Sequence, residues 1–242
     1  MVTCLDRPAV VLFRGNPRRD AQQKRLPRKL LSIVQRALLK TLAAFAVDVF
    51  LAENDERIFS VIGPRRAATW TIDSLGGRIG AAVRFCFDSG YRRVLLLAGD
   101  IVALDHADLA RALDSLCGGD HAAIGGSGDG GFYIAGFTRA PSVDWERVVA
   151  DRSRAAEELI QQLEREGFAV ARLRRIDDID SIADARRAVR MLTFSRTLLR
   201  VIAQLASLWS TKRPHARRCV PVRRAFEGFS TSLRAPPPLA LR

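Results

Sequence analysis

The sequence has few of the residues on which common catalytic and metal-binding motifs depend. Its 242 residues include four cysteines and three histidines. The cysteines show no C-x-x-C spacing, which fits reduced thiols better than a disulfide framework or a zinc site. The histidines show no metal-ligand spacing and no association with a nucleophilic serine or cysteine. These absences give no support to a zinc enzyme or a triad hydrolase.

Long apolar runs and targeting signals are also missing. No run of about 18 apolar residues is present, which argues against a membrane-spanning helix. The first residues have no basic segment, and Asp6-Arg7 interrupts the first apolar residues, so we expect no secretory signal. A cytoplasmic protein is therefore expected.

Acidic residues are scarce at the two ends of the chain, whose formal net charge is +13. Residues 1–40 hold ten Lys/Arg against two Asp, and residues 211–242 hold eight against one Glu, whereas the centre is close to neutral. Basic ends can attract polyanions non-specifically. No zinc-finger spacing, helix-turn-helix signature or aromatic-basic strand motif is present, so we expect no specific nucleic-acid binding. Association with nucleic acid through the basic ends stays an alternative.

What is present is an alternation of apolar strand-like segments with helical ones. A strand is predicted over residues 93–98, in which every residue after Arg93 is apolar, as in a central parallel strand. The other predicted strands are 9–13, 47–51, 68–72, 122–124, 132–137 and 168–173, and the predicted helices are 27–46, 80–88, 105–117, 154–166 and one after Ser181. This alternation predicts an α/β fold with a mainly parallel, doubly wound sheet and helices on both faces.

The composition changes near residue 190. We expect a domain over residues 1–190, an amphipathic helix over 191–210, and a basic tail rich in Pro and Arg over 211–242 that is extended or flexible. The helix is expected to pack on the domain. Peripheral contact of this helix with a membrane surface is the alternative.

Carboxylates follow several of the predicted strands. In open parallel sheets, ligands bind outside the carboxyl ends of the strands. Asp100 directly follows strand 93–98 and could hold a divalent cation that bridges the phosphates of a nucleotide. The alternative, equally favoured, is that Asp100 caps the next helix. Asp178 and Asp180 form another acidic group, in which one residue can serve as a helix cap.

The segment GSGDGGFYIAGF, residues 126–137, places Asp129 among four glycines at the start of a predicted strand. One interpretation is a hairpin turn, and the other is a substrate-facing loop with an acid at its tip. After the first strand, a basic segment that includes Lys24 and Arg25 could bind phosphate groups through charge-assisted hydrogen bonds. Its alternative is a solvated charged face.

Five segments occur in an order that resembles a known family. They are FRGNPRRDAQQKRL, LGGRI, VLLLAGDIVAL, GDGGFYIAG and DIDSIADA. Together they resemble an uncharacterised bacterial family with a glycosyltransferase-A-like, nucleotide-diphospho-sugar transferase fold, often labelled radical-SAM/selenodomain-associated transferases. The match runs across most of residues 8–190.

The resemblance implies a glycosyltransferase that moves a glycosyl group from a nucleotide sugar to an unknown acceptor, with Mg²⁺ or Mn²⁺ at strand-end aspartates. Nucleotidyl transfer on the same fold is the alternative. Asp129 and Asp100 would be catalytic, and Asp100, Asp178 and Asp180 would hold the metal. The implied substrate-binding residues are Lys24, Arg25, Arg78, Gly130, Gly131 and Tyr133.

The sequence departs from the family pattern at four charged positions. Gly15 and Gln23 stand where the family has lysines, and Gly77 and Gly128 stand where it has glutamates. Loss of one preorganised charged group typically costs about 10²–10³ in rate. A non-catalytic, nucleotide-binding or regulatory member of the family is therefore a further alternative.

Overall fold

The computed structural model describes residues 7–14, 36, 38–53, 57–72, 74–101 and 104–176. The chain divides into two units, Met1–Ala203 and Gln204–Arg242, and all of the described residues belong to the first. The predicted helix over 191–210 and the tail over 211–242 lie outside the described residues.

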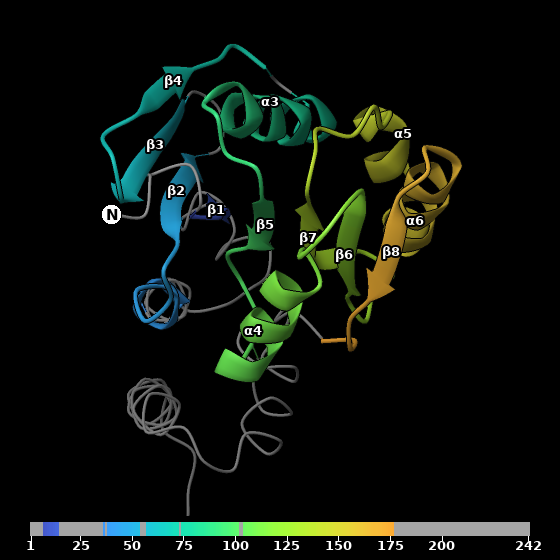
Figure 1. Cartoon of the computed structure of the whole chain (residues 1–242). Helices are drawn as coiled ribbons and strands as arrows, with labels where there is room; N and C mark the ends of the chain where they lie inside the picture. Colours follow the sequence, from blue (N-terminus) through green and yellow to red (C-terminus); the bar gives the residue numbers. More distant parts are fainter. Residues whose placement is uncertain are drawn as a thin grey trace, which may run out of the picture. The chain divides into compact units, whose positions relative to one another are not determined.

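Within the described residues, the strands form one eight-stranded sheet of order β4-β3-β2-β1-β5-β7-β6-β8 (Figure 1). The strands are β1 (Ala9–Arg14), β2 (Asp48–Glu53), β3 (Arg57–Ile62), β4 (Ala67–Thr69), β5 (Val94–Ala98), β6 (His121–Gly126), β7 (Phe132–Phe137) and β8 (Ala169–Arg172). Strand β5 is buried along nearly its whole length, as its uniformly apolar sequence predicts.

Most of the described helices begin at a residue whose side chain satisfies a free backbone N–H group, and α6 is the exception. They are α3 (Leu75–Asp88), α4 (His106–Asp114), α5 (Trp145–Ala150), the 3₁₀ turn η2 (Arg152–Arg154) and α6 (Ala155–Arg165). Ser74 accepts a hydrogen bond at the start of α3, and Asp105 and Asp108 form a reciprocal capping box at the start of α4. Residues 38–42 are also helical, inside the helix predicted over 27–46.

Helices cover both faces of the sheet, which confirms that part of the prediction. Alternate side chains such as Val11, Phe50 and Leu96 form one core with α3, α5 and α6. The intervening side chains face the other way. A Cβ atom added to Gly136 would lie 2.8 Å from both Leu95 and Leu116, so the chain after α4 packs on this second face.

The sheet is mixed, so the prediction of a mainly parallel sheet is matched only in part. Among the described strands, only the pairs β1–β2, β1–β5 and β6–β8 are parallel. The segment of β3 was not predicted as a strand, and it pairs antiparallel to β2 and β4. Strand β7 pairs antiparallel to β5 and β6, because the five residues 127–131 are too few for the crossover that parallel neighbours need.

The strand directions bring several chain segments to one edge. Strands β1, β2, β5, β6 and β8 all end at this edge, and β7 begins there; we name it the carboxyl edge and the other the opposite edge. Strand order reverses between β1 and β5, because β2 lies on one side of β1 and β5 on the other. Such a switch point is the usual ligand site of an open α/β sheet. None of the described helices is both long and apolar enough to span a bilayer.

Candidate functional site

The glycine-rich segment is a hairpin loop at the carboxyl edge. Residues 127–131 join the antiparallel neighbours β6 and β7. Inside the loop, the Ser127 N–H donates to the Gly131 carbonyl at 2.8 Å, and the Gly130 N–H donates to the Ser127 carbonyl at 3.2 Å. The hairpin interpretation is therefore confirmed, and it places Asp129 at the tip of the loop.

Gly130 is required by contact with the protein's own backbone. Its φ is +92°, and an added Cβ atom would lie 1.9 Å from the carbonyl oxygen of Ser153 in η2. The Gly130 carbonyl also accepts from the N–H of Ala156 at 3.1 Å. This glycine thus lets the loop dock on the start of α6, which is a structural reason for a residue that the sequence analysis assigned to substrate binding.

The Asp129 carboxylate is held in place by its own loop. Its Oδ1 accepts hydrogen bonds from the Ser127 hydroxyl and, at 3.0 Å, from the Gly131 N–H. Gly131 leaves room for this arrangement, because a Cβ there would lie 3.1 Å from Oδ1. Partial burial raises the pKa of Asp129, but these hydrogen bonds, with a smaller effect of Arg152, outweigh it and lower the pKa below its ordinary value. Asp129 is therefore a fixed anion at neutral pH.

The residues after β8 run beside β6 as far as this loop. The N–H of Leu173 donates to the Ile124 carbonyl at 2.8 Å, and that of Ile176 donates to the Gly126 carbonyl at 3.1 Å. Between them, the Arg175 guanidinium donates to the Gly128 carbonyl. This segment therefore forms a second wall of the site that the sequence analysis did not identify.

Arg174 ties the same segment to α4. Its guanidinium donates through two nitrogens to the buried carboxylate of Asp108. Burial raises the pKa of Asp108, but the hydrogen bonds and charge of Arg174, together with the Asp105 backbone N–H, lower it below its ordinary value. Nothing in the sequence indicates this contact, because Asp108 of the capping box and Arg174 are 66 residues apart.

Tyr133, which the sequence analysis assigned to substrate binding, is 1% exposed. Its hydroxyl donates to the Arg174 carbonyl at 3.0 Å. Burial, with a further contribution from Asp108, raises the pKa of this phenol to about 12. Tyr133 is therefore a neutral hydrogen-bond donor that holds the segment after β8 in place.

Asp100 lies at the switch point of the strand order. It follows β5 in the turn of Gly99 and Asp100 and is half-buried. Only β7 lies between β5 and β6 in the sheet, so the ends of these two strands are separated by about 10 Å, two strand spacings. The fold therefore brings the segments of Asp100 and Asp129 to neighbouring positions on the carboxyl edge, as the sequence analysis expected of strand-end acids.

Arg78 is not brought to this edge. It lies in the first turns of α3, where a Cβ on Gly80 would lie 2.8 Å from the ring of Trp145. The Trp145 ring packs edge-on against Phe137 with centroids 6.0 Å apart, at the end of β7 remote from the glycine loop. Arg78 is therefore on the side of the opposite edge.

Gly77 has a structural explanation. A Cβ there would lie 2.6 Å from Ile72 and 2.8 Å from the Ser74 hydroxyl, so no side chain fits without movement. Its N–H donates to Ser74 at 3.1 Å and to the Glu146 carboxylate at 2.8 Å. The start of α3 thus takes its carboxylate from α5, and the glutamate expected at position 77 has no room.

Other predicted site residues, Lys24, Arg25, Asp178 and Asp180, lie outside the described residues, as do Gly15 and Gln23. Across the part of the chain that the structure describes, no group of three or more His, Cys, Asp or Glu side chains could hold a metal ion. Asp100 by itself fits the chemistry of Mg²⁺, which keeps several waters and binds through one or two carboxylates plus substrate phosphates.

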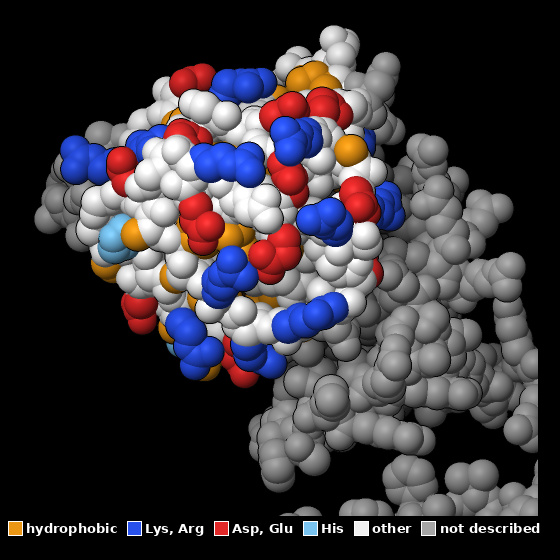
Figure 2. All heavy atoms as spheres, turned by 90° about the vertical axis from the view of Figure 1, so that its right-hand side faces the viewer, with side chains coloured by type: hydrophobic (Ala, Val, Ile, Leu, Met, Phe, Trp, Pro, Cys, Tyr) orange, Lys and Arg blue, Asp and Glu red, His pale blue; other side chains and the backbone are white. Residues whose placement is uncertain are grey.

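The surface around α6 and β8 carries both signs of charge (Figure 2). Acidic and basic side chains alternate there in ion pairs, such as Arg172–Glu157 at 3.1 Å and Arg147–Glu158 at 2.8 Å. This face therefore does not gather the positive charge that the whole sequence carries.

Comparison with known proteins supports the family resemblance. Residues 66–150 match a family described as "Uncharacterized protein conserved in bacteria (DUF2064)". This stretch runs from β4 to α5 and includes Asp100 and the glycine loop. The resemblance to an uncharacterised bacterial family is thereby confirmed, whereas the association with radical-SAM proteins stays a prediction.

A solved structure shows the same fold. The crystal structure of a protein assigned as a nucleotide-diphospho-sugar transferase, from Desulfovibrio desulfuricans G20, has a TM-score of 0.65 at 21% sequence identity. The match covers 84% of this chain and 96% of that one. The chain therefore shares the fold of that protein.

Two further structures are more distant. An rv0371c homologue from Mycobacterium sp. strain JC1 has a TM-score of 0.40 at 14% identity, over 81% of this chain and 98% of that one. A protein assigned as a glucose-1-phosphate thymidylyltransferase from Bacillus anthracis has a TM-score of 0.42 at 9% identity, over 79% and 99%. We base no inference on either, since both scores are below 0.5. No curated protein matches the chain.

Proposed function

We propose that this protein transfers a glycosyl group from a nucleotide sugar to an acceptor, with the donor bound at the carboxyl edge between β1 and β5. The observation that carries the proposal is the position of Asp100, which lies in the turn after the central strand β5, at the switch point of a fold shared with a nucleotide-diphospho-sugar transferase. A donor diphosphate at this point would meet a carboxylate through a divalent cation.

The proposed metal ligands are Asp100, Asp178 and Asp180. A bound Mg²⁺ or Mn²⁺ would offset the negative charge that develops on the leaving diphosphate. Lys24 and Arg25, which follow β1 in the sequence, are proposed to bind the donor phosphates, since guanidinium and ammonium groups form charge-assisted hydrogen bonds with them.

Asp129 is proposed to orient the acceptor. A general base works best when its pKa lies near the operating pH, and the pKa of Asp129 is lowered instead. A fixed, ionised carboxylate is well suited to accept a hydrogen bond from an acceptor hydroxyl. We therefore assign Asp129 to positioning the nucleophile, with proton removal as a minor role.

The test is calorimetric titration of nucleotide sugars in the presence of Mn²⁺, followed by assay of donor turnover. We expect Asp100→Asn to abolish metal-dependent donor binding and to lower turnover by about 10² or more. Asp114→Asn is the matched control, because Asp114 is an exposed acid at the end of α4. Absence of donor binding by the wild type, or equal binding by Asp100→Asn, would contradict the proposal.

The reaction products distinguish glycosyl transfer from nucleotidyl transfer and from a non-catalytic protein. Release of a nucleoside diphosphate from the donor supports glycosyl transfer, whereas release of pyrophosphate from a nucleoside triphosphate and a sugar phosphate would identify nucleotidyl transfer. Metal-dependent binding without any turnover would instead identify a nucleotide-binding, regulatory protein. Turnover that is strongly reduced by Asp129→Asn would exclude that last alternative.

A further inference from the structure

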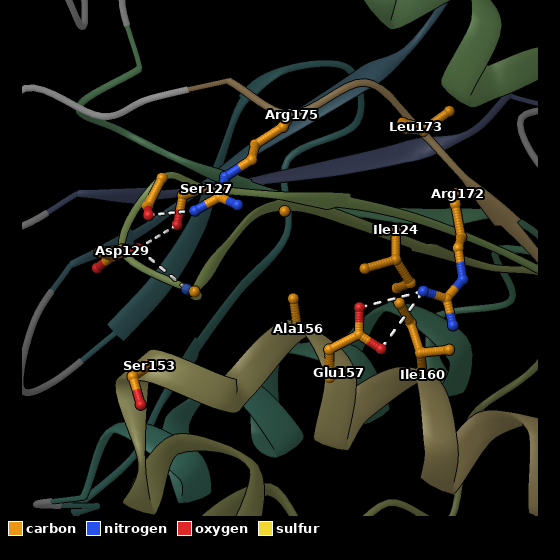
Figure 3. A pocket seen from close by; sticks show the side chains of 14 residues that line it. Ile124, Ser127, Asp129, Ser153, Ala156, Glu157, Ile160, Arg172, Leu173 and Arg175 are labelled. Carbon is orange, nitrogen blue, oxygen red and sulfur yellow. Dashed lines mark hydrogen bonds and ion pairs between the residues drawn. The ribbon is translucent and has the colours of Figure 1, made fainter.

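A cavity of about 400 Å³ opens beside the glycine loop, where α6 packs against the sheet (Figure 3). The loop of residues 126–131 forms one wall, and Ala156, Glu157 and Ile160 of α6 form another. The end of β8 and the residues after it, up to Arg175, close the third side. Three segments that are distant in the sequence thus meet around one hollow.

The interior of this cavity is aliphatic and its rim is charged. Ile124, Ala156 and Ile160 are buried, at 2%, 8% and 4% exposure. Arg172 and Arg175, by contrast, are exposed. Four apolar side chains and six polar or charged ones line the hollow, and its volume falls in the range of small-molecule sites, about 300–1,000 Å³.

The two guanidinium groups at the rim differ in their partners. The Nη1 of Arg172 lies 3.1 and 3.3 Å from the two carboxylate oxygens of Glu157, so its charge is neutralised. Arg175 donates to the Gly128 carbonyl, and no carboxylate of the described residues lies within ion-pair distance of it. Figure 3 shows Arg172 at the end of β8 and Arg175 in the residues that follow it, with the Arg175 side chain directed toward the loop.

Arg175 therefore presents a positive charge at the cavity that is held by a backbone carbonyl and is paired with no carboxylate of the described residues. A guanidinium has five N–H donors, and the Gly128 carbonyl occupies one, which leaves donors for two oxygens of an anion. Asp129 lies in the loop wall of the same cavity and accepts hydrogen bonds as an anion. The rim thus offers a donor for an anionic group on one side and an acceptor for hydroxyls on another.

We propose that this cavity binds the acceptor of the transfer, and that the acceptor is a small hydroxylated compound with a phosphate or carboxylate group. Arg175 binds the anionic group, the aliphatic interior covers the carbon skeleton, and Asp129 receives a hydroxyl. The identification of this ligand as the acceptor rests on the proposed transferase function, but binding of such a molecule to the cavity can be measured without a donor.

The test uses three compounds of similar size: glucose 6-phosphate, glucuronate and glucose. Each is titrated into isotopically labelled protein while the backbone amide signals of residues 126–131, 153–157 and 172–176 are followed. We expect saturable shifts of these signals with at least one anionic compound, and at least tenfold weaker binding of glucose. The comparison of phosphate with carboxylate identifies which anion the site takes.

Variants of Arg175 distinguish an effect of its charge on binding from an effect on the fold. Arg175→Gln should weaken binding of the anionic compound at least fivefold, and Arg175→Lys should restore part of it. Arg165→Gln is the matched control, because it removes one exposed arginine at the far end of α6. Absence of shifts at these residues with both anionic compounds, or equal binding by Arg175→Gln and Arg165→Gln, would overturn the proposal.

The failure of this inference differs from the failure of the proposed function. If nucleotide sugars bind with Mn²⁺ while both anionic compounds leave the cavity signals unchanged, only the acceptor site is wrong. If the anionic compounds bind in the Arg175-dependent manner and no donor binds, the cavity remains a site for anionic sugars and the transferase proposal fails.

Discussion

The charged groups at the two edges of the sheet have different kinds of partners. At the opposite edge, the buried carboxylate of Asp48 at the start of β2 accepts from the Tyr91 hydroxyl at 2.8 Å. Arg139, just after β7, pairs with Glu166 and with Asp120 at 3.1 Å, and it lies 4.0 Å from the centre of the Phe168 ring. Charge at this edge is satisfied by other parts of the protein.

At the carboxyl edge, only part of the charge is satisfied in that way. Arg174 and Asp108 form a pair, but Asp129 takes only neutral donors from its own loop, and Arg175 takes a backbone carbonyl. Charges that the fold has already paired stabilise the protein, and those held in place by neutral partners can still bind a ligand. We therefore propose that the charges of the opposite edge stabilise the fold and that those of the carboxyl edge bind a ligand.

The largest expected effect on stability compares two glycines, one at each edge. Gly130 and Gly167 have φ angles of +92° and +89°, but a Cβ on Gly167 would meet no atom within 4 Å. We expect Gly167→Ala to lower the free energy of unfolding by about 1 kcal/mol, the cost of the backbone conformation. Gly130→Ala should lower it by about 3 kcal/mol, because its Cβ also collides with Ser153. Urea denaturation measures both, and equal losses would show that the loop docks loosely on η2.

A smaller effect is expected from Tyr91→Phe at the opposite edge. The substitution removes the hydroxyl that donates to the buried Asp48 carboxylate, so the free energy of unfolding should fall by about 1–2 kcal/mol. Binding of donor and of anionic compounds should be unchanged, because Tyr91 is remote from the carboxyl edge. A loss of ligand affinity in this variant would contradict the assignment of stability to the opposite edge and of binding to the carboxyl edge.

The smallest effect concerns the pH dependence of stability through Asp129. Its pKa is lowered in the folded protein, so ionised Asp129 stabilises the fold at pH values above its unfolded pKa of about 3.9. This contribution is lost as the pH falls through the lower, folded pKa. Because the side chain is exposed, we expect Asp129→Asn to cost at most about 1 kcal/mol at pH 7.

Denaturation of both proteins between pH 7 and pH 2 tests this expectation. The difference between wild type and Asp129→Asn should shrink toward zero at the acid end. A difference that persists or grows at low pH would mean that the carboxylate is not stabilised as an anion by Ser127 and Gly131.

Local sequence was a reliable guide where burial and turn chemistry agree. Residues 132–137 form the predicted strand, and α6 lies within one residue of the predicted helix, because both have a clear apolar pattern between strong turn signals. Strand β3 was missed because its sequence, RIFSVI, mixes charged, polar and apolar residues at a half-exposed position. The six-residue helix α5 was missed because so short an apolar pattern is ambiguous.

The residues of the candidate site also divide into those whose position local sequence indicates and those whose position it does not. The neighbouring positions of Asp100 and Asp129 could be predicted because both lie beside strand ends, and strand ends converge at one edge of a sheet. Their roles stay predictions. Arg174, Arg175 and Glu157 could not be predicted, because in the sequence they are members of ordinary charged segments. Their roles depend on which groups lie opposite them: Asp108 neutralises Arg174, Glu157 neutralises Arg172, and Arg175 is left with a carbonyl.

The sequence by itself determined the alternation of strands and helices and the resemblance to a sugar-nucleotide transferase fold, because these depend on local residue patterns. It left the glycine cluster open between a hairpin turn and a substrate-facing loop. Only the tertiary structure decided the mixed directions of the strands, the structural need for Gly130 and Gly77, and the partners of each charge. Those properties depend on contacts between segments that lie far apart in the chain, and no local pattern encodes such contacts.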